Sequence, residues 1–244
     1  MRSLNLLLVM AFLGFASGMF AQCGLFISEY SEGSSNNKYI EIYNPTNESV
    51  DLTQYAIASV GNAPTTPGVH EYWNEFAEGA VIAAGEVYVW SNGGSDPFII
   101  AETDQTGNAY FNGDDGYALV LGSEDDYEFV DIIGNFEADP GSGWDVAGVA
   151  DATKDHTLVR KSSVAQGIGY DWAASAGTDA DDSQWIVYDQ NEWSYVGSHV
   201  WTGTCGAAVP GCTNANATNY NDAATTDDGS CTFDNACNAD GIVV

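Results

Sequence analysis

Residues 26–45, FISEYSEGSSNNKYIEIYNP, consist of two runs of β-branched and aromatic residues on either side of a polar segment. Side chains alternate between the two faces of a strand, so Ile40 and Ile42 share one face of the second run. That face is the natural core face, and we expect Glu41 to point outward. The polar segment 33–37, GSSNN, has the small and amide residues that turn a chain without a core. The stretch therefore predicts a long hairpin rather than a ligand site.

Lys38, at the end of the polar segment, is one of only five basic residues in the chain. Lysine at this place either blunts the edge of a sheet or pairs with the acidic residues around it. The nearby acidic residues are Glu29, Glu32 and Glu41.

Other short β-like runs recur along the chain with turn residues between them, and helical periodicity is nearly absent. Regularly spaced short strands predict a β-sandwich or barrel rather than a fold of alternating strands and helices. In GYALVLGSEDDYEFVDIIG, residues 116–134, an acidic turn separates two apolar runs and predicts a hairpin. The expected strands are 24–30, 38–44, 54–60, 86–92, 117–123, 127–134, 156–161 and 183–188.

The first 22 residues have the organisation of a secretory signal: Arg2, a short apolar run and small residues before Cys23. The apolar run is too short to span a bilayer, and no later segment replaces it. A lipoprotein leader is the alternative, but Gln22 stands where a lipobox requires a small residue. We therefore expect a secreted, soluble protein without a transmembrane segment.

Acidic residues outnumber basic ones by 35 to 5. Such a surface repels phosphate backbones, and the few scattered cations cannot form the basic patch that nucleic-acid binding requires. The excess of negative charge favours either solubility in a salty medium or the binding of divalent cations. We expect the first for the main domain and consider the second only near the C-terminus.

The five cysteines fit an exported protein. Cys23 and Cys205 bracket the long middle of the chain, and Cys212, Cys231 and Cys237 cluster near its end. Sequence does not decide the pairing, and the odd number leaves at least one thiol without an internal partner. We take two bonds as hypotheses: Cys23 with Cys205, which joins both ends of the main domain, and Cys212 with Cys231.

Several separated motifs resemble the lamin-tail domain of bacterial secreted proteins. The first is FISEYSEGSSNNKYIEIYNPTNESVDLTQYAI, followed in order by VIAAGEVYV, AYFNGDDGYALV, VDIIGNFEADPGSGW and KDHTLVRK. The resemblance covers residues 24–200 and implies an immunoglobulin-like β-sandwich. We expect a signal peptide over 1–22, the lamin-tail sandwich over 23–204, a linker over 205–211 and a partial repeat over 212–244.

The C-terminal segment GCTNANATNYNDAATTDDGSC is similar to the Asp- and Asn-rich, Cys-bounded repeats of secreted proteins and, more loosely, to thrombospondin type 3 calcium-binding repeats. It has few large apolar residues and needs a disulfide, a metal or both to order it. Hard oxygen donors predict a calcium site, and a solvated acidic linker is the alternative. The expected ligands are Asn219, Asn221, Asp222, Asp227 and Asp228.

No catalytic residues are expected. His70, His156 and His199 lie in different segments, and the chain has no nucleophile elbow, zinc-protease motif or phosphate loop. His156 stands where members of the resembled family commonly have asparagine, which suits a structural position.

Three further features of the main domain have a structural and a binding interpretation. In FNGDDG, residues 111–116, a tight turn whose aspartates bond local N–H groups is favoured over a cation site, which needs about six oxygens or more. Surface ion pairing is favoured over an anion site for Lys154, Arg160 and Lys161, because alternation separates the last two. Core packing is favoured over a sugar-binding platform for Trp73, Trp90, Trp144 and Trp193.

The sequence therefore predicts a secreted, non-enzymatic binding or scaffolding module for extracellular or cell-surface adhesion, stabilised by calcium. Its partner is an extracellular protein or a glycan, and the chain belongs to a larger secreted architecture. One alternative is an accessory domain of an extracellular nuclease or phosphatase whose catalytic part lies outside this chain. The other is a carbohydrate-binding module.

Overall fold

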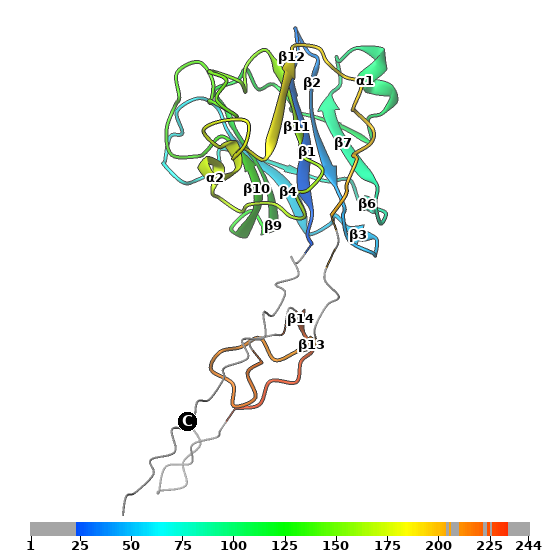
Figure 1. Cartoon of the computed structure of the whole chain (residues 1–244), viewed down its shortest axis with the longest axis vertical. Helices are drawn as coiled ribbons and strands as arrows, with labels where there is room; N and C mark the ends of the chain where they lie inside the picture. Colours follow the sequence, from blue (N-terminus) through cyan, green and yellow to red (C-terminus); the bar gives the residue numbers. More distant parts are fainter. Residues whose placement is uncertain (1–22, 204, 206–209, 222–223, 225, 234–244) are drawn as a thin grey trace, which may run out of the picture.

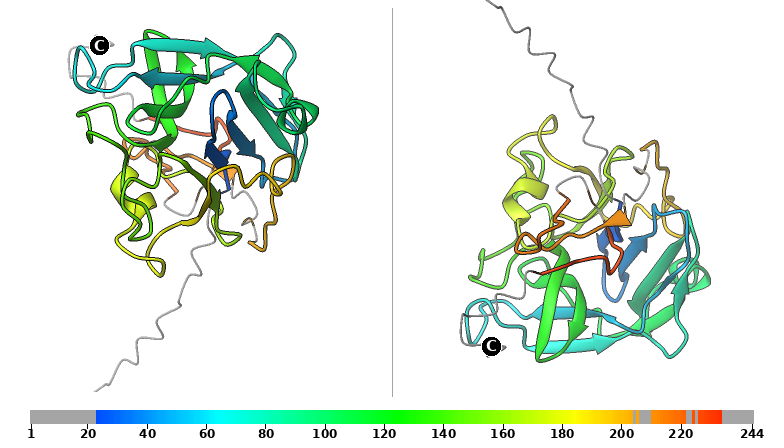
Figure 2. Two further views of the ribbon diagram at one scale, coloured as in Figure 1. Left: turned by 90° about the horizontal axis from the view of Figure 1, so that it is seen from above. Right: turned by 90° about the horizontal axis from the view of Figure 1, so that it is seen from below.

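The computed structural model describes residues 23–203, 205, 210–221, 224 and 226–233 (Figure 1). Two β-sheets lie face to face and form an immunoglobulin-like sandwich, which confirms the predicted fold class (Figure 2). The first sheet has the order β12-β11-β1-β2-β7-β8: Trp185–Asp189, His156–Arg160, Phe26–Glu32, Lys38–Tyr43, Val87–Asn92 and Gln105–Gly107. The second has the order β10-β9-β4-β5: Asp126–Ile133, Gly116–Ser123, Tyr55–Val60 and Tyr72–Glu75.

Short elements complete the described part of the chain. A small ladder joins β3 to β6, and another joins β13 to β14 in the tail. Two helices of about one turn, α1 beside β7 and α2 near β10, lie at the sides of the sandwich (Figure 1). The bounds are Val50–Asp51, Val81–Ile82, Pro210–Gly211 and Thr226–Asp227 for these strands, and Pro97–Ala101 and Trp172–Ala176 for the helices.

All eight predicted strands are present, with ends that differ from the prediction by about two residues or fewer. The predicted hairpin of residues 116–134 is β9 and β10, and its pairing runs from Tyr117 opposite Ile133 to Ser123 opposite Asp126. The acidic turn is thus reduced to two residues. Gln54, just before β4, accepts a hydrogen bond through its carbonyl from Gly122 N–H at 2.8 Å.

The hairpin predicted from residues 26–45 is β1 and β2, paired antiparallel up to Glu32 opposite Lys38. Gly33 begins its loop, where any Cβ would overlap the carbonyl oxygen of Asn37. Lys38 forms an ion pair with Glu32. The polar insert is therefore a turn, as expected.

The core between the sheets includes Ile40 and Ile42 of β2, the two residues that the alternation placed on the core face. The prediction that Glu41 points outward is wrong, because only 1% of Glu41 is exposed. The outer face of the first sheet is covered by α1 and by the segment near Val196, which form a second apolar cluster with Tyr39. Alternation separates the two faces of a strand, but it does not show that a distant segment covers the second one.

The prediction of surface ion pairing is wrong for Arg160. Its side chain is fully buried and forms an ion pair with Asp131, which is also fully buried. Arg160 lies on β11 of the first sheet and Asp131 on β10 of the second, so the pair joins the two layers. The guanidinium carbon lies 4.0 Å from the ring centroid of Trp185, a cation–π contact.

The other two cations of that group are exposed or half-buried. Lys161 donates to the carbonyl of Ala180 at 2.7 Å, and Lys154 donates to Ser142 Oγ at 3.3 Å. Neither forms an ion pair with a described carboxylate.

Two disulfide bonds are present, between Cys23 and Cys205 and between Cys212 and Cys231, and they are the pairings that the sequence left as hypotheses. The first joins residues 182 positions apart and ties together the two ends of the sandwich. Cys237, the predicted signal segment and most of the predicted linker lie outside the described residues. Among the described residues, no helix has the length and apolar character needed to cross a bilayer.

Candidate functional site

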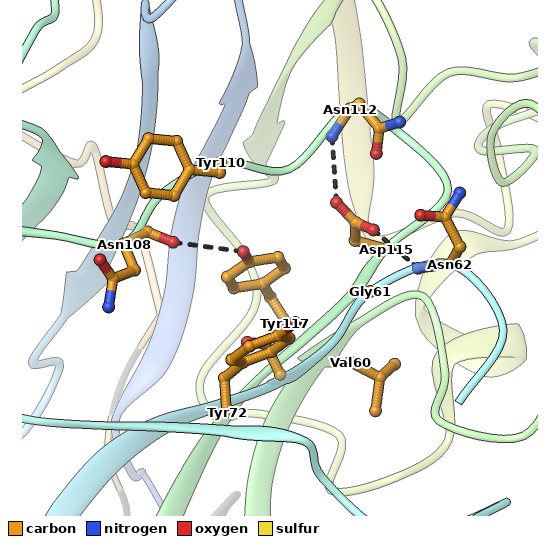
Figure 3. Close-up of a pocket in the computed structure, with 10 residues that line it drawn as sticks. Val60, Gly61, Asn62, Tyr72, Asn108, Tyr110, Asn112, Asp115 and Tyr117 are labelled. Carbon is orange, nitrogen blue, oxygen red and sulfur yellow. Dashed lines mark hydrogen bonds between the residues drawn. The ribbon is translucent and has the colours of Figure 1, made fainter. Parts of the chain in front are cut away.

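A pocket of about 610 Å³ opens at the point where β4 ends and β9 begins (Figure 3). Its volume lies in the range of small-molecule sites, roughly 300–1,000 Å³. One wall is aromatic, and the facing wall carries side-chain amides and a carboxylate. The lining residues are Ser59, Val60, Gly61, Asn62, Tyr72, Asn108, Tyr110, Asn112, Asp115 and Tyr117.

The turn predicted in FNGDDG forms the polar wall. Asp115 accepts a hydrogen bond from Asn112 N–H at 3.1 Å, as expected for an aspartate that closes a local turn. Its second oxygen accepts from Asn62 N–H at 2.8 Å, which ties the turn to the end of β4. Gly113 has φ +106°, a conformation that favours glycine, so the turn can follow this path without strain.

Asn62 is fixed by the neighbouring carboxylates. It has φ +49°, a left-handed conformation that asparagine adopts more readily than most residues. Its Nδ2 donates to Asp114 Oδ2 at 2.7 Å. The other oxygen of Asp114 is buried and accepts no hydrogen bond from the described residues. Hydrogen bonds to Asp114 and Asp115 therefore hold Asn62 in place in the polar wall.

The aromatic wall has a buried base and an exposed rim. Tyr117 is 6% exposed and packs edge-on against Phe111 at 4.9 Å between ring centroids. Burial and the charge of Asp115 raise the pKa of Tyr117, so its phenol is neutral. Tyr72 and Tyr110 are 60% and 66% exposed at the rim.

The pocket is acidic. Burial raises the pKa of Asp115, and the hydrogen bonds from Asn62 and Asn112 act in the opposite direction. The cation that acts on Asp115 is Lys38, which is itself paired with Glu32. A ligand with negative charge is therefore disfavoured here.

The sequence did not single out these rim tyrosines, and the tryptophans that it named do not line the pocket. Trp90 is buried in the core, as the structural interpretation expected. Trp73, Trp144 and Trp193 are partly buried, and Trp73 packs against His70 and Tyr127. Neither Tyr72 nor Tyr110 has a local sequence signal, because they line one pocket only after β5 and the loop before β9 have packed together.

The three histidines have different surroundings, and the structure does not bring them together. His70 lies 3.2 Å from the hydroxyl of Tyr127, and His156 lies 2.6 Å from the carbonyl of Lys154. His199 packs against Phe26 and Tyr43. Burial, and then the charge of Arg160, lower the pKa of His199 to about 4.

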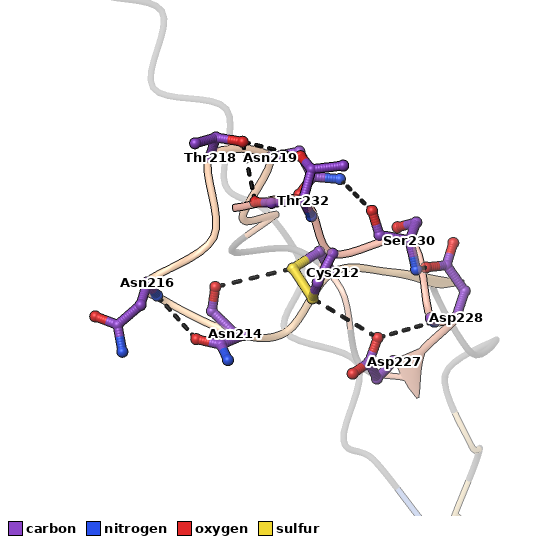
Figure 4. The surroundings of a disulfide bond; sticks show 11 residues. Cys212, Asn214, Asn216, Thr218, Asn219, Asp227, Asp228, Ser230 and Thr232 are labelled. Carbon is purple, nitrogen blue, oxygen red and sulfur yellow. Dashed lines mark hydrogen bonds between the residues drawn. A yellow bond between two sulfur atoms is a disulfide. The ribbon is translucent and has the colours of Figure 1, made fainter. Parts of the chain in front are cut away.

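In the tail, three of the five predicted calcium ligands make hydrogen bonds near the disulfide of Cys212 and Cys231, Asn219 across the loop and Asp227 and Asp228 within local turns (Figure 4). Asn219 donates to the carbonyl of Ser230 at 2.7 Å and accepts from Thr232 N–H at 2.8 Å.

Asp227 accepts from Gly229 N–H at 3.0 Å, and Asp228 accepts from Ser230 N–H at 2.9 Å. Asp222 lies outside the described residues, and the backbone N–H of Asn221 donates to the carbonyl of Cys212. In the described part of the chain, no group of three or more histidine, cysteine, aspartate or glutamate residues is arranged to hold a metal. Calcium binding therefore stays a prediction.

Residues 20–135 match the family model of the Lamin Tail Domain. No curated protein matches the chain. The match ends near the end of β10, while β11 pairs with β1 and β12 pairs with β11, so the same sandwich continues beyond it. The strand arrangement shows an immunoglobulin-like sandwich, and its part up to β10 is similar to the Lamin Tail Domain.

Proposed function

We propose that this protein is an exported, non-enzymatic binding and scaffolding module that acts outside the cell. It is attached through the end of the sandwich that carries Cys23 and Cys205, and it binds its ligand at the pocket. The lamin-tail type supports a role without catalysis, because it is a family of non-catalytic immunoglobulin-like domains. The two disulfides support export, because such bonds persist in oxidising compartments.

The observation that carries this proposal is the distance between the pocket and the disulfide along β2. Lys38, at the start of β2, lies 5.9 Å from the ring centroid of Phe111, and Phe111 packs against Tyr117 in the pocket wall. At the other end of the strand, Cys205 contacts the carbonyl of Pro45. The strand between them spans roughly 20 Å at about 3.3 Å per residue. The pocket therefore lies near the end of the sandwich that is farther from the disulfide of Cys23 and Cys205.

This arrangement suits an adhesion module that is joined to other parts of a secreted architecture and presents its free end to a partner. A role beside an extracellular nuclease or phosphatase is compatible with the same attachment. Direct contact with nucleic acid is disfavoured by the formal net charge of −30.

A binding assay on cell surfaces tests the proposal. The full chain, labelled at its C-terminus, is incubated with cell envelopes and extracellular matrix of the cells that produce it. We expect retention that falls in the double variant Tyr72→Ala/Tyr110→Ala and persists in Phe98→Ala, which removes a ring of similar exposure from α1.

N-terminal sequencing of the protein recovered from the medium tests export, and we expect a mature chain that begins near Cys23. Retention that does not depend on the pocket, or a chain that stays inside the cell with reduced cysteines, would contradict the proposal.

A further inference from the structure

We infer that the pocket binds a neutral saccharide, with one sugar ring lying against the tyrosines and its hydroxyl groups facing the asparagines. This inference rests on the proposed binding function and names its ligand class. Four properties of the pocket support it: the exposed aromatic rim, the free amide groups, the acidic surroundings and the fixed polar wall.

The aromatic rim provides the apolar half of a sugar site. A pyranose ring has C–H groups on its faces and hydroxyl groups around its edge, so it stacks on an aromatic ring and bonds laterally. Tyr72 and Tyr110 belong to different segments and expose more than half of their surface beside one pocket. Single exposed aromatic residues are common on proteins, but two at the rim of one pocket mark a binding surface. Tyr117 continues this surface into the pocket.

The facing wall provides groups that both donate and accept hydrogen bonds. The side-chain amide of Asn112 forms no hydrogen bond with the described residues, although its backbone N–H does. Asn108, which lies on the side of the tyrosines (Figure 3), uses one N–H in a long bond of 3.3 Å to Asn74. Asn62 uses its Nδ2 and keeps its side-chain oxygen free. Amides suit hydroxyl ligands, because each hydroxyl also donates and accepts.

The charges distinguish a neutral sugar from charged ligands. Asp115 and Asp114 disfavour phosphate, sulfate and uronate groups near the pocket. A quaternary ammonium ligand would suit a cage of aromatic rings with a free carboxylate. Here, however, each oxygen of Asp115 already accepts a backbone N–H, from Asn62 and from Asn112. The carboxylate of Asp115 therefore acts as a clamp: it holds the two segments of the polar wall together through these hydrogen bonds. Because its oxygens are already used, it is not available to a cation, and a neutral ligand is favoured.

The clamp also lowers the cost of binding. Asp115 holds the end of β4 and the turn before β9 in one position, and Asn62 keeps its left-handed conformation there. A wall that is ordered before the ligand arrives loses little conformational entropy on binding.

The test uses the full chain with both disulfides formed. It is applied to an array of neutral polysaccharides and oligosaccharides of glucose, mannose, galactose and N-acetylhexosamines, with polygalacturonate, a sulfated galactan and choline as comparisons. Positive ligands are then titrated by calorimetry against the wild type, Tyr110→Ala, Asn112→Ala and the control Phe98→Ala. We expect at least one neutral saccharide to bind and each pocket variant to weaken its binding about two- to tenfold, because a lost stacking or hydrogen-bonding contact has an effect of this size. Phe98→Ala should bind as the wild type does.

The outcomes separate this inference from the proposed function. If the chain binds cell surfaces through the pocket but neutral sugars neither bind nor compete, the proposed function stands and the saccharide inference is overturned. If only choline or only the anionic polymers bind, the inference is overturned in favour of that ligand class. If a neutral saccharide binds equally well to all variants, the site lies elsewhere. If neither surfaces nor saccharides are bound, both proposals fall. Equal melting temperatures for the four proteins show that the variants remain folded.

Discussion

Glu29 and Glu41 lie directly opposite each other on β1 and β2, and each is only 1% exposed. The hydroxyl of Tyr39 donates to Glu29, while Ser28 Oγ and Gly197 N–H donate to Glu41 at 2.7 and 2.8 Å. Burial, followed by the charge of Glu41, raises the pKa of Glu29 well above its ordinary value. Burial raises the pKa of Glu41 to about 7. The pair therefore holds protons at pH values at which exposed carboxyl groups have lost theirs.

This pair predicts that the sandwich becomes less stable as the pH rises from about 5 to 8. The folded pKa of Glu41 is about 7 and its ordinary value is 4.5, so the folded state binds more protons in this range. The stabilisation is fully present below about pH 4.5 and is lost as the pH passes 7. For Glu41 alone the loss is on the order of 3 kcal/mol in the free energy of unfolding. Urea unfolding at pH 5 and pH 8 measures it.

The substitution Glu41→Gln tests whether this carboxyl is the cause. The amide can still bond Ser28 and Gly197, and it cannot ionise. We expect the difference in stability between pH 5 and pH 8 to shrink by ~1–3 kcal/mol. The control is Glu48→Gln, which removes the same charge from an exposed position. An equal change in both variants would assign the pH dependence to the general negative charge instead.

The buried pair of Arg160 and Asp131 predicts a strong dependence of stability on Asp131. Asp131 accepts from Ile27 N–H at 2.9 Å as well as from the guanidinium, so it fixes β1 and β11 against β10. Asp131→Ala leaves the Arg160 charge buried without a partner, which costs about 3–5 kcal/mol. Urea unfolding at pH 7 measures this loss.

The matched control is Asp126→Ala, at an exposed position on the same strand. We expect its effect to stay within about 0.5 kcal/mol. A loss of less than about 1 kcal/mol in Asp131→Ala would show that the pair does not hold the layers together.

The strands were predictable because their signal is local. Alternation along β2 correctly placed Ile40 and Ile42 in the core. The same alternation could not predict that Glu41 is buried, because Gly197, which covers it, lies 156 positions away. The burial of Arg160 could not be predicted for the same reason, because its partner Asp131 belongs to the other sheet.

The candidate site was predictable only in part. The turn at Asp115 follows from glycine, asparagine and aspartate in FNGDDG, whose preferences are local. The rim follows from packing between segments, since Tyr72 and Tyr110 are 38 positions apart in the chain. In the sequence, both tyrosines look like ordinary core aromatic residues. Only their exposure in the folded domain distinguishes them from the buried Trp90.

The bond between Cys23 and Cys205 predicts a large loss of stability when it is removed. It closes a loop of 182 residues, for which chain entropy gives a stabilisation of at most about 5 kcal/mol. We expect Cys23→Ser/Cys205→Ser to unfold at a markedly lower urea concentration. All seven tryptophans lie between residues 73 and 201, so tryptophan fluorescence reports on the sandwich.

The control for this measurement is Cys212→Ser/Cys231→Ser, which removes the short loop of the tail. Its fluorescence transition should stay within about 0.5 kcal/mol of the wild type, because the bond closes a loop that contains no part of the sandwich. Equal losses in both double variants would mean that the tail contributes to the stability of the sandwich.

Calcium binding by the tail is the remaining prediction of the sequence. Asp227 accepts from a backbone N–H in a local turn, and Asp228 accepts from both the backbone and the side chain of Ser230. Their carboxylate oxygens, in a loop closed by Cys212 and Cys231, can contribute to a site, and calcium needs about six oxygens in all. Calorimetry of the full chain with millimolar calcium should show heat that disappears in Asp227→Asn/Asp228→Asn and persists in Asp181→Asn, an exposed position in the sandwich. Absence of heat, or heat that both variants retain, would leave the tail as a solvated acidic segment held only by its disulfide.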